Sequence, residues 1–356
     1  MKGYLVLEDG TVMEGRPFGF SKDITGEVVF STGMTGYQES LTDPSYCGQI
    51  LVSSYPMIGN YGINSESSQS GRVQVRGYVI GELCDVPSHR LSDMTLNEFL
   101  KQDEVPGISR IDTRALIRRL RLKGTMRGAI TTADPVAALE QVRGMRNPDE
   151  ENLVARVSTP EAVAYESGKG RRVVVIDCGV KESILKELRA RFDVVQVPFD
   201  ASADSIRAMD PDGVFITNGP GNPAQEEMLE TTVGTLRELK EEIPMMGICL
   251  GNQLLALALG AKTYKLKFGH RGINQPVGKD GRVYITSQNH GFAVDGASAE
   301  DVGMEITFVN LNDGTVEGMR HSDLPIFSVQ FHPEARPGPL DTRSLFDEFA
   351  KMLEGP

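Results

Sequence analysis

Apolar residues in the second half of the chain form short continuous runs that alternate with stretches of helical spacing. Helical patterns near residues 181–191 and 225–241 separate these runs. Continuous β-branched runs separated by helices are typical of a parallel sheet that is covered on both faces. We therefore predict an α/β domain with a mostly parallel sheet over residues 173–356. The runs are VVVID (173–177), VVQVP (194–198), GVFIT (213–217) and PMMGIC (244–249).

The first half of the chain carries a different pattern, in which short β-like runs are broken by Gly, Pro and Asn. One clear helix is indicated in GISRIDTRALIRRL, where Asp112 or Thr113 can cap its start and Gly124 can end it. We predict a β-rich α/β domain over residues 1–155. The segment 156–172 is rich in Ser, Gly and charge, which is typical of a linker. The β-like runs are YLVLEDG, EVVFSTG, QILVSSYP and VRGYVIGEL.

The length and composition fit a two-domain globular protein. The chain has 356 residues, of which 40% are hydrophobic and 24% are charged. No run approaches the roughly 20 apolar residues that a membrane span needs. The start, MKGYLVLEDGTVMEG, lacks the basic and apolar regions of a signal peptide. We therefore expect a cytoplasmic protein that does not act at a membrane.

The formal net charge of −12 disfavours a general affinity for nucleic acid, because such binding depends on Lys and Arg. The basic stretch 113–127 is better interpreted as the solvated face of a helix, since apolar residues recur within it at near-helical spacing. The four cysteines are scattered and form no C-x-x-C pair, which suggests free thiols and neither a disulfide framework nor a zinc site. These cysteines are Cys47, Cys84, Cys178 and Cys249.

The sequence G-I-C-L-G places Cys249 between an apolar strand and an apolar helix. This frame follows the logic of the nucleophile elbow, in which small neighbours permit a tight strand-to-helix turn. Gly247 and Gly251 provide that room, and the positive end of the following helix favours a thiolate. The alternative is an inert buried thiol, which is the common fate of a lone cysteine.

A cysteine nucleophile needs a base, and the base needs a group that orients it. His332 follows the apolar run IFSVQF and precedes Pro333 and Glu334. If this segment is extended, side chains two residues apart share a face, so Glu334 can bind one ring nitrogen of His332. Oxyanion donors can come from the backbone N–H of Leu250 and from the glycines of NGPGNP (218–223). A surface turn at H-P-E and a simple Gly-Pro turn remain the alternatives.

Three motifs, GICLGNQ, NGPGNP and QFHPE, together resemble the class I glutamine amidotransferases. Further motifs extend this resemblance over nearly the whole chain, to the small-subunit family of carbamoyl-phosphate synthase. The family implies that Cys249 is the nucleophile forming a glutamyl thioester, His332 the general base and acid, and Glu334 its orienting group. The further motifs are MTGYQESLTDPSYCGQI (34–50), YPMIGNYG (55–62), IDTR (111–114), KFGHRGINQPV (267–277) and SQNHGFAVD (287–295).

The resemblance also implies a glutamine-binding site made of backbone groups and neutral polar side chains. Taken singly, several of these positions have other readings, since Ser45 can belong to a turn and Asn289 to a hairpin bend. One departure concerns Asn252, where many relatives have His, because an amide cannot titrate near neutral pH. The implied glutamine-binding residues are Ser45, Gly219, Gly221, Leu250, Gln253, Asn289, Gly291 and Phe292.

The family passes ammonia to a large subunit that makes carbamoyl phosphate for arginine and pyrimidine synthesis. This chain has no G-x-x-x-x-G-K-[ST] phosphate loop. The resemblance therefore implies ATP and magnesium on the partner, and no cofactor or metal on this chain. Two alternatives remain: a glutaminase that serves guanylate or anthranilate synthesis, and a cysteine peptidase or silent interaction subunit. The N-terminal motifs argue against the first alternative, and the intact Cys-His-Glu set argues against silence.

Overall fold

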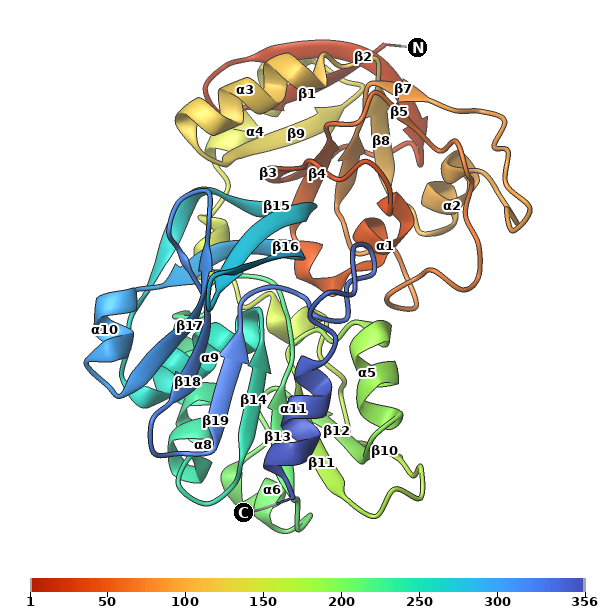
Figure 1. The fold of residues 1–356 in the computed structure, drawn as a ribbon. Coiled ribbons are helices and arrows are strands. Elements are labelled where there is room, and N and C mark those ends of the chain that lie inside the picture. Colours follow the sequence, from red (N-terminus) through yellow and green to blue (C-terminus); the bar gives the residue numbers. More distant parts are fainter. Residues whose placement is uncertain (1, 355–356) are drawn as a thin grey trace. The chain divides into compact units, whose positions relative to one another are not determined.

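A computed structural model describes residues 2–354 and divides the chain into two compact units, Met1–Pro148 and Asp149–Pro356 (Figure 1). The predicted linker 156–172 lies within the second unit. It contributes strand β10 (Val163–Tyr165), which pairs with the edge of the second unit's sheet. No helix among the residues that the structure describes is long and apolar enough to cross a membrane. All four cysteines are free, as predicted.

The first unit is built on a closed barrel with the strand order β1-β2-β8-β6-β4-β3-β9, and β5 and β7 form a separate pair (Figure 1). This arrangement confirms the predicted β-rich N-terminal domain. Its strands are β1 (Gly3–Leu7), β2 (Val12–Gly19), β3 (Ile24–Ser31), β4 (Gln49–Ser53), β5 (Met57–Ile58), β6 (Gly77–Val79), β7 (Glu82–Leu83), β8 (Pro106–Ser109) and β9 (Met126–Thr131). Its helices are α1 (Tyr37–Thr42), α2 (Leu96–Gln102), α3 (Thr113–Lys123) and α4 (Pro135–Arg143).

Helix α3 begins and ends where the sequence indicates. The carboxylate of Asp112 accepts a hydrogen bond from the N–H of Ala115, and Gly124 ends the helix with φ 103°. Leu116 and Leu120 are buried. Ile117 is partly buried, whereas Leu122 and most of the basic side chains face solvent, so the basic stretch is a solvated helix face.

The second unit contains a 10-stranded sheet with the order β10-β12-β11-β13-β14-β19-β18-β17-β15-β16. The strands β12, β11, β13, β14 and β19 run parallel to one another, as the sequence predicts. The strands beyond β19 continue the sheet antiparallel, and the sequence pattern had not indicated this extension. The other strands are β11 (Arg172–Asp177), β12 (Asp193–Pro198), β13 (Gly213–Ile216), β14 (Met245–Ile248), β15 (Thr263–Lys279), β16 (Arg282–Val294), β17 (Met304–Asn310), β18 (Val316–His321) and β19 (Ile326–Val329).

Helices cover both faces of the parallel strands (Figure 1). Helices α6, α8 and α9 pack on one face, and α5 and α11 pack on the other. The predicted long helix near 225–241 is divided at Thr231 into α7 and α8. The helices are α5 (Glu182–Arg189), α6 (Ala203–Arg207), α7 (Glu226–Glu230), α8 (Thr232–Leu239), α9 (Leu250–Leu259), α10 (Gly296–Glu300) and α11 (Leu345–Met352).

Neighbouring residues of the interior strand β11 pack into opposite cores, because successive side chains of a strand point to opposite faces. Val174 packs against the helices of one face, whereas Val173 and Val175 pack against those of the other. A strand buried on both sides must be apolar throughout, which explains the run VVVI. Because the strands β12, β11, β13, β14 and β19 are parallel, their carboxyl ends meet at one edge of the sheet, where ligands bind in folds of this kind.

Phe349 of α11 closes one of these cores, so its truncation should destabilise the second unit. The ring is fully buried and meets Phe192 and Phe215 edge-on. Removing a buried aromatic ring leaves a cavity, so Phe349→Ala should lower the free energy of unfolding by about 3–5 kcal/mol. Urea unfolding of the full chain measures this change. Leu340→Ala is the control, because Leu340 is 54% exposed and its truncation should have little effect. Equal effects of the two substitutions would contradict the described core.

Candidate active site

Cys249 occupies a tight turn between strand β14 and helix α9. Its backbone has φ 57° and ψ −103°, a conformation that residues with a side chain rarely adopt. Holding such a residue costs about 1–3 kcal/mol, and strain of this kind is concentrated at functional sites. The side chain is 1% exposed. The turn thus has the strand, bend and helix that a nucleophile elbow requires.

The two glycines of the elbow are required by close packing. A Cβ atom on Gly247 would lie 2.6 Å from the backbone of Gly251. A Cβ atom on Gly251 would lie 2.2 Å from the carbonyl oxygen of Ile216 on the neighbouring strand. Helix α9 therefore starts directly against the sheet. Its first turn, which includes the N–H of Leu250, has N–H groups without partners inside the helix.

His332 and Glu334 form a buried pair, with 2.7 Å between Nδ1 of the ring and Oε1 of the carboxylate. The sequence analysis expected an extended segment here, but the chain makes a turn. The backbone N–H of His332 donates to the carbonyl of Ser287, and the N–H of Ala335 donates back to the carbonyl of His332. The turn brings the two side chains together because it folds Glu334 back toward the ring.

Lys181 is a third member of this group, and the sequence analysis missed it. Its Nζ atom lies 2.8 Å from Oε1 of Glu334 and 2.6 Å from the carbonyl oxygen of Ala335. The residue is 2% exposed, and a lysine is rarely buried unless it is paired. It directly precedes helix α5, just after strand β11, at the same sheet edge as Cys249. Its position after a strand end was the one available signal.

The charges of Lys181, His332 and Glu334 decide whether His332 and Glu334 carry a proton. Burial by itself raises the pKa of Glu334, but the charges of Lys181 and His332 outweigh it and lower the pKa to about 2. Burial by itself lowers the pKa of His332, whereas the charge of Glu334 raises it, and the net shift is upward. The carboxylate is therefore ionised and the ring holds its proton at neutral pH.

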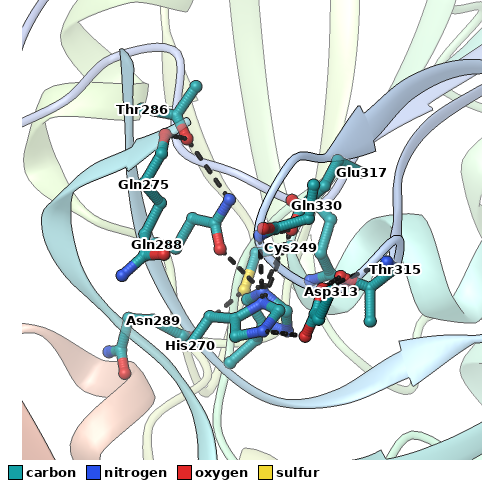
Figure 2. Close-up of polar contacts among 12 residues, drawn as sticks. Cys249, His270, Gln275, Thr286, Gln288, Asn289, Asp313, Thr315, Glu317 and Gln330 are labelled. Carbon is teal, nitrogen blue, oxygen red and sulfur yellow. Dashed lines mark hydrogen bonds and ion pairs between the residues drawn. The ribbon is translucent and has the colours of Figure 1, made fainter. Parts of the chain in front are cut away.

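The thiol lies beside the ring. Nε2 of His332 makes no hydrogen bond with any of residues 2–354. The interaction of the ring with Cys249 is nevertheless one cause of the raised pKa of His332. The Sγ atom of Cys249 donates instead to the carbonyl oxygen of Asn289, at 3.5 Å (Figure 2). The free ring nitrogen is thus placed for proton transfer to or from a group that reacts at the sulfur.

Several of the predicted glutamine-binding residues of the second unit contact the elbow or helix α9. Gly219 packs against it, since a Cβ there would lie 2.8 Å from Cδ2 of Leu250. Gln253 of α9 donates to the carbonyl oxygen of Phe292 at 2.8 Å, which ties the helix to strand β16. The same strand carries Asn289 and Gly291.

Two of the remaining predicted residues lie in tight turns. Gly221 takes φ 90° in the loop after β13, a value that favours glycine. Ser45 lies in the other unit, in a short 3-10 helix, Pro44–Tyr46, where its N–H donates to the side chain of Asp43 at 2.9 Å. The side chain of Ser45 is buried.

Asn252 has a structural explanation that involves no proton transfer. It is fully buried in α9, and its carbonyl oxygen accepts from the hydroxyl of Ser328 on β19 at 2.8 Å. Its amide donates to the side chain of Gln330 at 3.2 Å. The neutral amide therefore ties α9 to the strand that leads to His332.

Comparison with known proteins shows which family the chain is similar to. Residues 5–130 match the family model of the carbamoyl-phosphate synthase small chain, CPSase domain. Residues 174–352 match the model of glutamine amidotransferase class I. The chain is 53% identical to the carbamoyl phosphate synthase small chain of Methanopyrus kandleri, over 99% of both chains. It is 52% identical to that of Archaeoglobus fulgidus, over 99% of both, and 50% identical to that of Bacillus caldolyticus, over 99% and 97%.

The charge of Glu334 can be tested through the pH dependence of glutamine hydrolysis. His332 should lose its proton at high pH, because Glu334 raises its pKa. Glu334→Gln removes that cause, so the alkaline limb of the kcat/KM profile should move to lower pH. The rate should also fall, by about 10²–10⁴ if the ring is no longer oriented. Glu187→Gln on α5, whose partners are arginines outside this group, is the control and should leave the profile in place. An unmoved alkaline limb in Glu334→Gln would contradict the assignment.

Proposed function

Since the chain belongs to the family of carbamoyl-phosphate synthase small chains, we propose that it hydrolyses L-glutamine through a thioester on Cys249. It is an enzyme subunit with a class I glutamine amidotransferase domain, and its relatives at about half identity are named for the same small chain. The observation that carries the proposal is the buried set of Cys249, His332 and Glu334. A thiol in a strained turn beside a charged, oriented imidazole is what acyl transfer by cysteine needs.

The reaction begins when the sulfur of Cys249, as a thiolate, attacks the side-chain amide carbon of glutamine. The carbonyl electrons move to oxygen, where the N–H of Leu250 and the loop at Gly219 stabilise the negative charge. The C–N bond then breaks as the imidazolium of His332 gives its proton to the departing nitrogen. Ammonia leaves, and a glutamyl thioester remains on the sulfur.

Water completes the cycle. His332, now neutral, takes a proton from the water as its oxygen attacks the thioester carbon, and the C–S bond breaks to restore the thiolate. Glutamate leaves. The proposed substrate contacts use backbone groups and neutral amides, which can satisfy the ammonium, carboxylate and amide of glutamine together. The family resemblance implies the following residues for these contacts: Ser45, Gly219, Gly221, Leu250, Gln253, Asn289, Gly291 and Phe292.

The ammonia serves a large, ATP-dependent synthetase chain, which uses it to make carbamoyl phosphate for arginine and pyrimidine synthesis. We place ATP and magnesium on that partner, and the reaction on this chain needs no cofactor. The N-terminal unit, which has no catalytic motif, supplies much of the contact with the partner. The assembled enzyme works in the cytoplasm.

The family match and the structure of the site disfavour the rival functions. A glutaminase for guanylate or anthranilate synthesis would not require an N-terminal region that matches the small-chain model over residues 5–130. A peptidase would have to accept a polypeptide at a thiol that is 1% exposed. A silent subunit has no need for a strained cysteine beside a charged histidine.

Cys249→Ser separates the two nitrogen sources of the complex. A hydroxyl is far less acidic than a thiol, so glutamine-dependent synthesis should fall by more than about 10³-fold. Synthesis from free ammonia should continue, because the partner's site is untouched. Cys84→Ser, in the N-terminal unit, is the matched control and should keep both activities. Glutamine-dependent synthesis that survives in Cys249→Ser would remove this residue from its role.

The isolated chain should hydrolyse glutamine slowly, because release of ammonia without an acceptor wastes the substrate. A coupling free energy of about 3 kcal/mol would give roughly 150-fold activation when the large chain and its substrates are bound. Steady-state ammonia release by the chain alone, with partner, and with partner plus ATP and bicarbonate measures this coupling. An isolated chain that already runs at the rate of the full complex would show that no coupling exists.

A further inference from the structure

A second group of buried titratable side chains lies in the C-terminal unit, outside the set that performs the proposed reaction (Figure 2). His270 on β15, His290 on β16 and Glu317 on β18 each offer one possible ligand atom, and these atoms lie within 4.8 Å of one another. The two histidines face each other in the β15/β16 register, with their rings edge-on at 4.9 Å. We call this group the His270–His290–Glu317 cluster.

Hydrogen bonds fix which nitrogen of each ring faces the centre of the cluster. Nδ1 of His290 lies 2.8 Å from the carbonyl oxygen of Phe292, which can only accept, so Nδ1 carries the proton. Nε2 of His270 lies 2.8 Å from a carboxylate oxygen of Asp313, so that nitrogen carries the proton. Each neutral ring therefore turns a lone pair inward. Histidines that bind metals show this arrangement, with the outer N–H held by a carbonyl or a carboxylate.

The centre of the cluster is rich in hydrogen-bond acceptors. Oε1 of Glu317 lies 3.5 Å from Nδ1 of His270 and 4.0 Å from Nε2 of His290. Oε1 of Gln288 lies 3.3 Å from the same Nε2 atom. Asn310 donates one hydrogen bond to Oε1 of Glu317, at 2.8 Å. Oε2 of this fully buried carboxylate has no hydrogen-bond partner within residues 2–354.

We propose that the His270–His290–Glu317 cluster binds one divalent transition-metal cation, for which Zn²⁺ is the best match. Two imidazoles and one carboxylate form an established zinc ligand set, with bonds of about 2.0–2.2 Å. Tetrahedral bonds of that length separate neighbouring ligand atoms by roughly 3.4 Å. Oε1 of Glu317 lies 3.5 Å and 4.0 Å from the two ring nitrogens, and all three atoms lie within 4.8 Å, so the side chains move closer together when they bind the ion. Magnesium and calcium prefer oxygen ligands, so they fit this donor set less well.

The cation has a structural role that goes beyond the proposed glutaminase function. It joins strands β15 and β16 to strand β18, and each of these three strands carries one of its ligands. Asn289, whose carbonyl oxygen accepts from the thiol of Cys249, directly precedes His290. A cation on His290 therefore holds strand β16 beside the nucleophile. The family resemblance implies no metal on this chain, and the ligands form no local motif because they come from three separate strands.

The test uses the full-length chain, purified without chelator and loaded with zinc alone. After dialysis, elemental analysis should find about one zinc per chain, and competition with a chromophoric chelator gives its Kd. Asp313→Asn loosens the hold on His270, so it should weaken binding about 10–100-fold. Glu317→Gln removes a ligand and should weaken binding further. His321→Gln is the matched control, because His321 lies on the same strand β18 outside the cluster and should keep the metal.

Cys249→Ser distinguishes the cluster from the catalytic thiol, which is itself a possible zinc ligand. It should keep full occupancy. Cobalt substitution should give the absorption of a tetrahedral site without a thiolate charge-transfer band. Zinc lost in Cys249→Ser but kept in a folded Glu317→Gln chain would overturn the proposal. A wild-type chain that binds no stoichiometric zinc or cobalt would also overturn the proposal. In that case a proton on His270 would supply the positive charge beside the carboxylate of Glu317. If circular dichroism shows that Glu317→Gln is unfolded, an unaltered Kd in Asp313→Asn decides against the proposal.

Discussion

The carboxylate of Glu334 is the charge on which the rest of the active site depends. One oxygen, Oε1, accepts from the ring of His332 at 2.7 Å and from Lys181 at 2.8 Å, and neither pair is open to water. A buried charge is costly unless it is paired, and removing one partner leaves the others uncompensated. The lysine and the protonated ring together carry one positive charge more than the carboxylate balances. In the proposed reaction, the thiolate form of Cys249 would balance this charge, whereas in the structure its Sγ atom donates to the carbonyl oxygen of Asn289.

The fold brings these four groups together from distant parts of the chain. Lys181 follows β11 and Cys249 follows β14, so both lie at the carboxyl edge of the parallel strands. His332 and Glu334 follow β19, the neighbour of β14 in the sheet. The glycines of the elbow allow α9 to begin against the strands, and Asn252 then ties that helix to β19 through Ser328. The sheet edge thus places these four side chains next to one another. Close packing at Gly247 and Gly251 then fixes the position of Cys249.

Much of this could be predicted from the sequence because it depends on local patterns. Continuous apolar runs indicated the parallel strands, and G-I-C-L-G indicated the strained turn at Cys249. The partnership of Lys181 could not be predicted, because nothing near this residue shows that its side chain is buried against a carboxylate far along the chain. The turn at His332 also escaped prediction, since its hydrogen bond to Ser287 joins separate strands. The closed barrel and the antiparallel extension of the sheet depend on pairings of the same long-range kind.

The protonation state of His332 tests the central claim most directly. Histidine-labelled full chain, followed by NMR across the neutral pH range, reports whether each ring nitrogen carries a proton. The signal that disappears in His332→Asn identifies the residue. A doubly protonated ring that persists well above pH 7 is the expected result, because Glu334 raises the pKa of His332. A neutral ring at pH 7, with a single tautomer, would contradict the charged arrangement around Glu334.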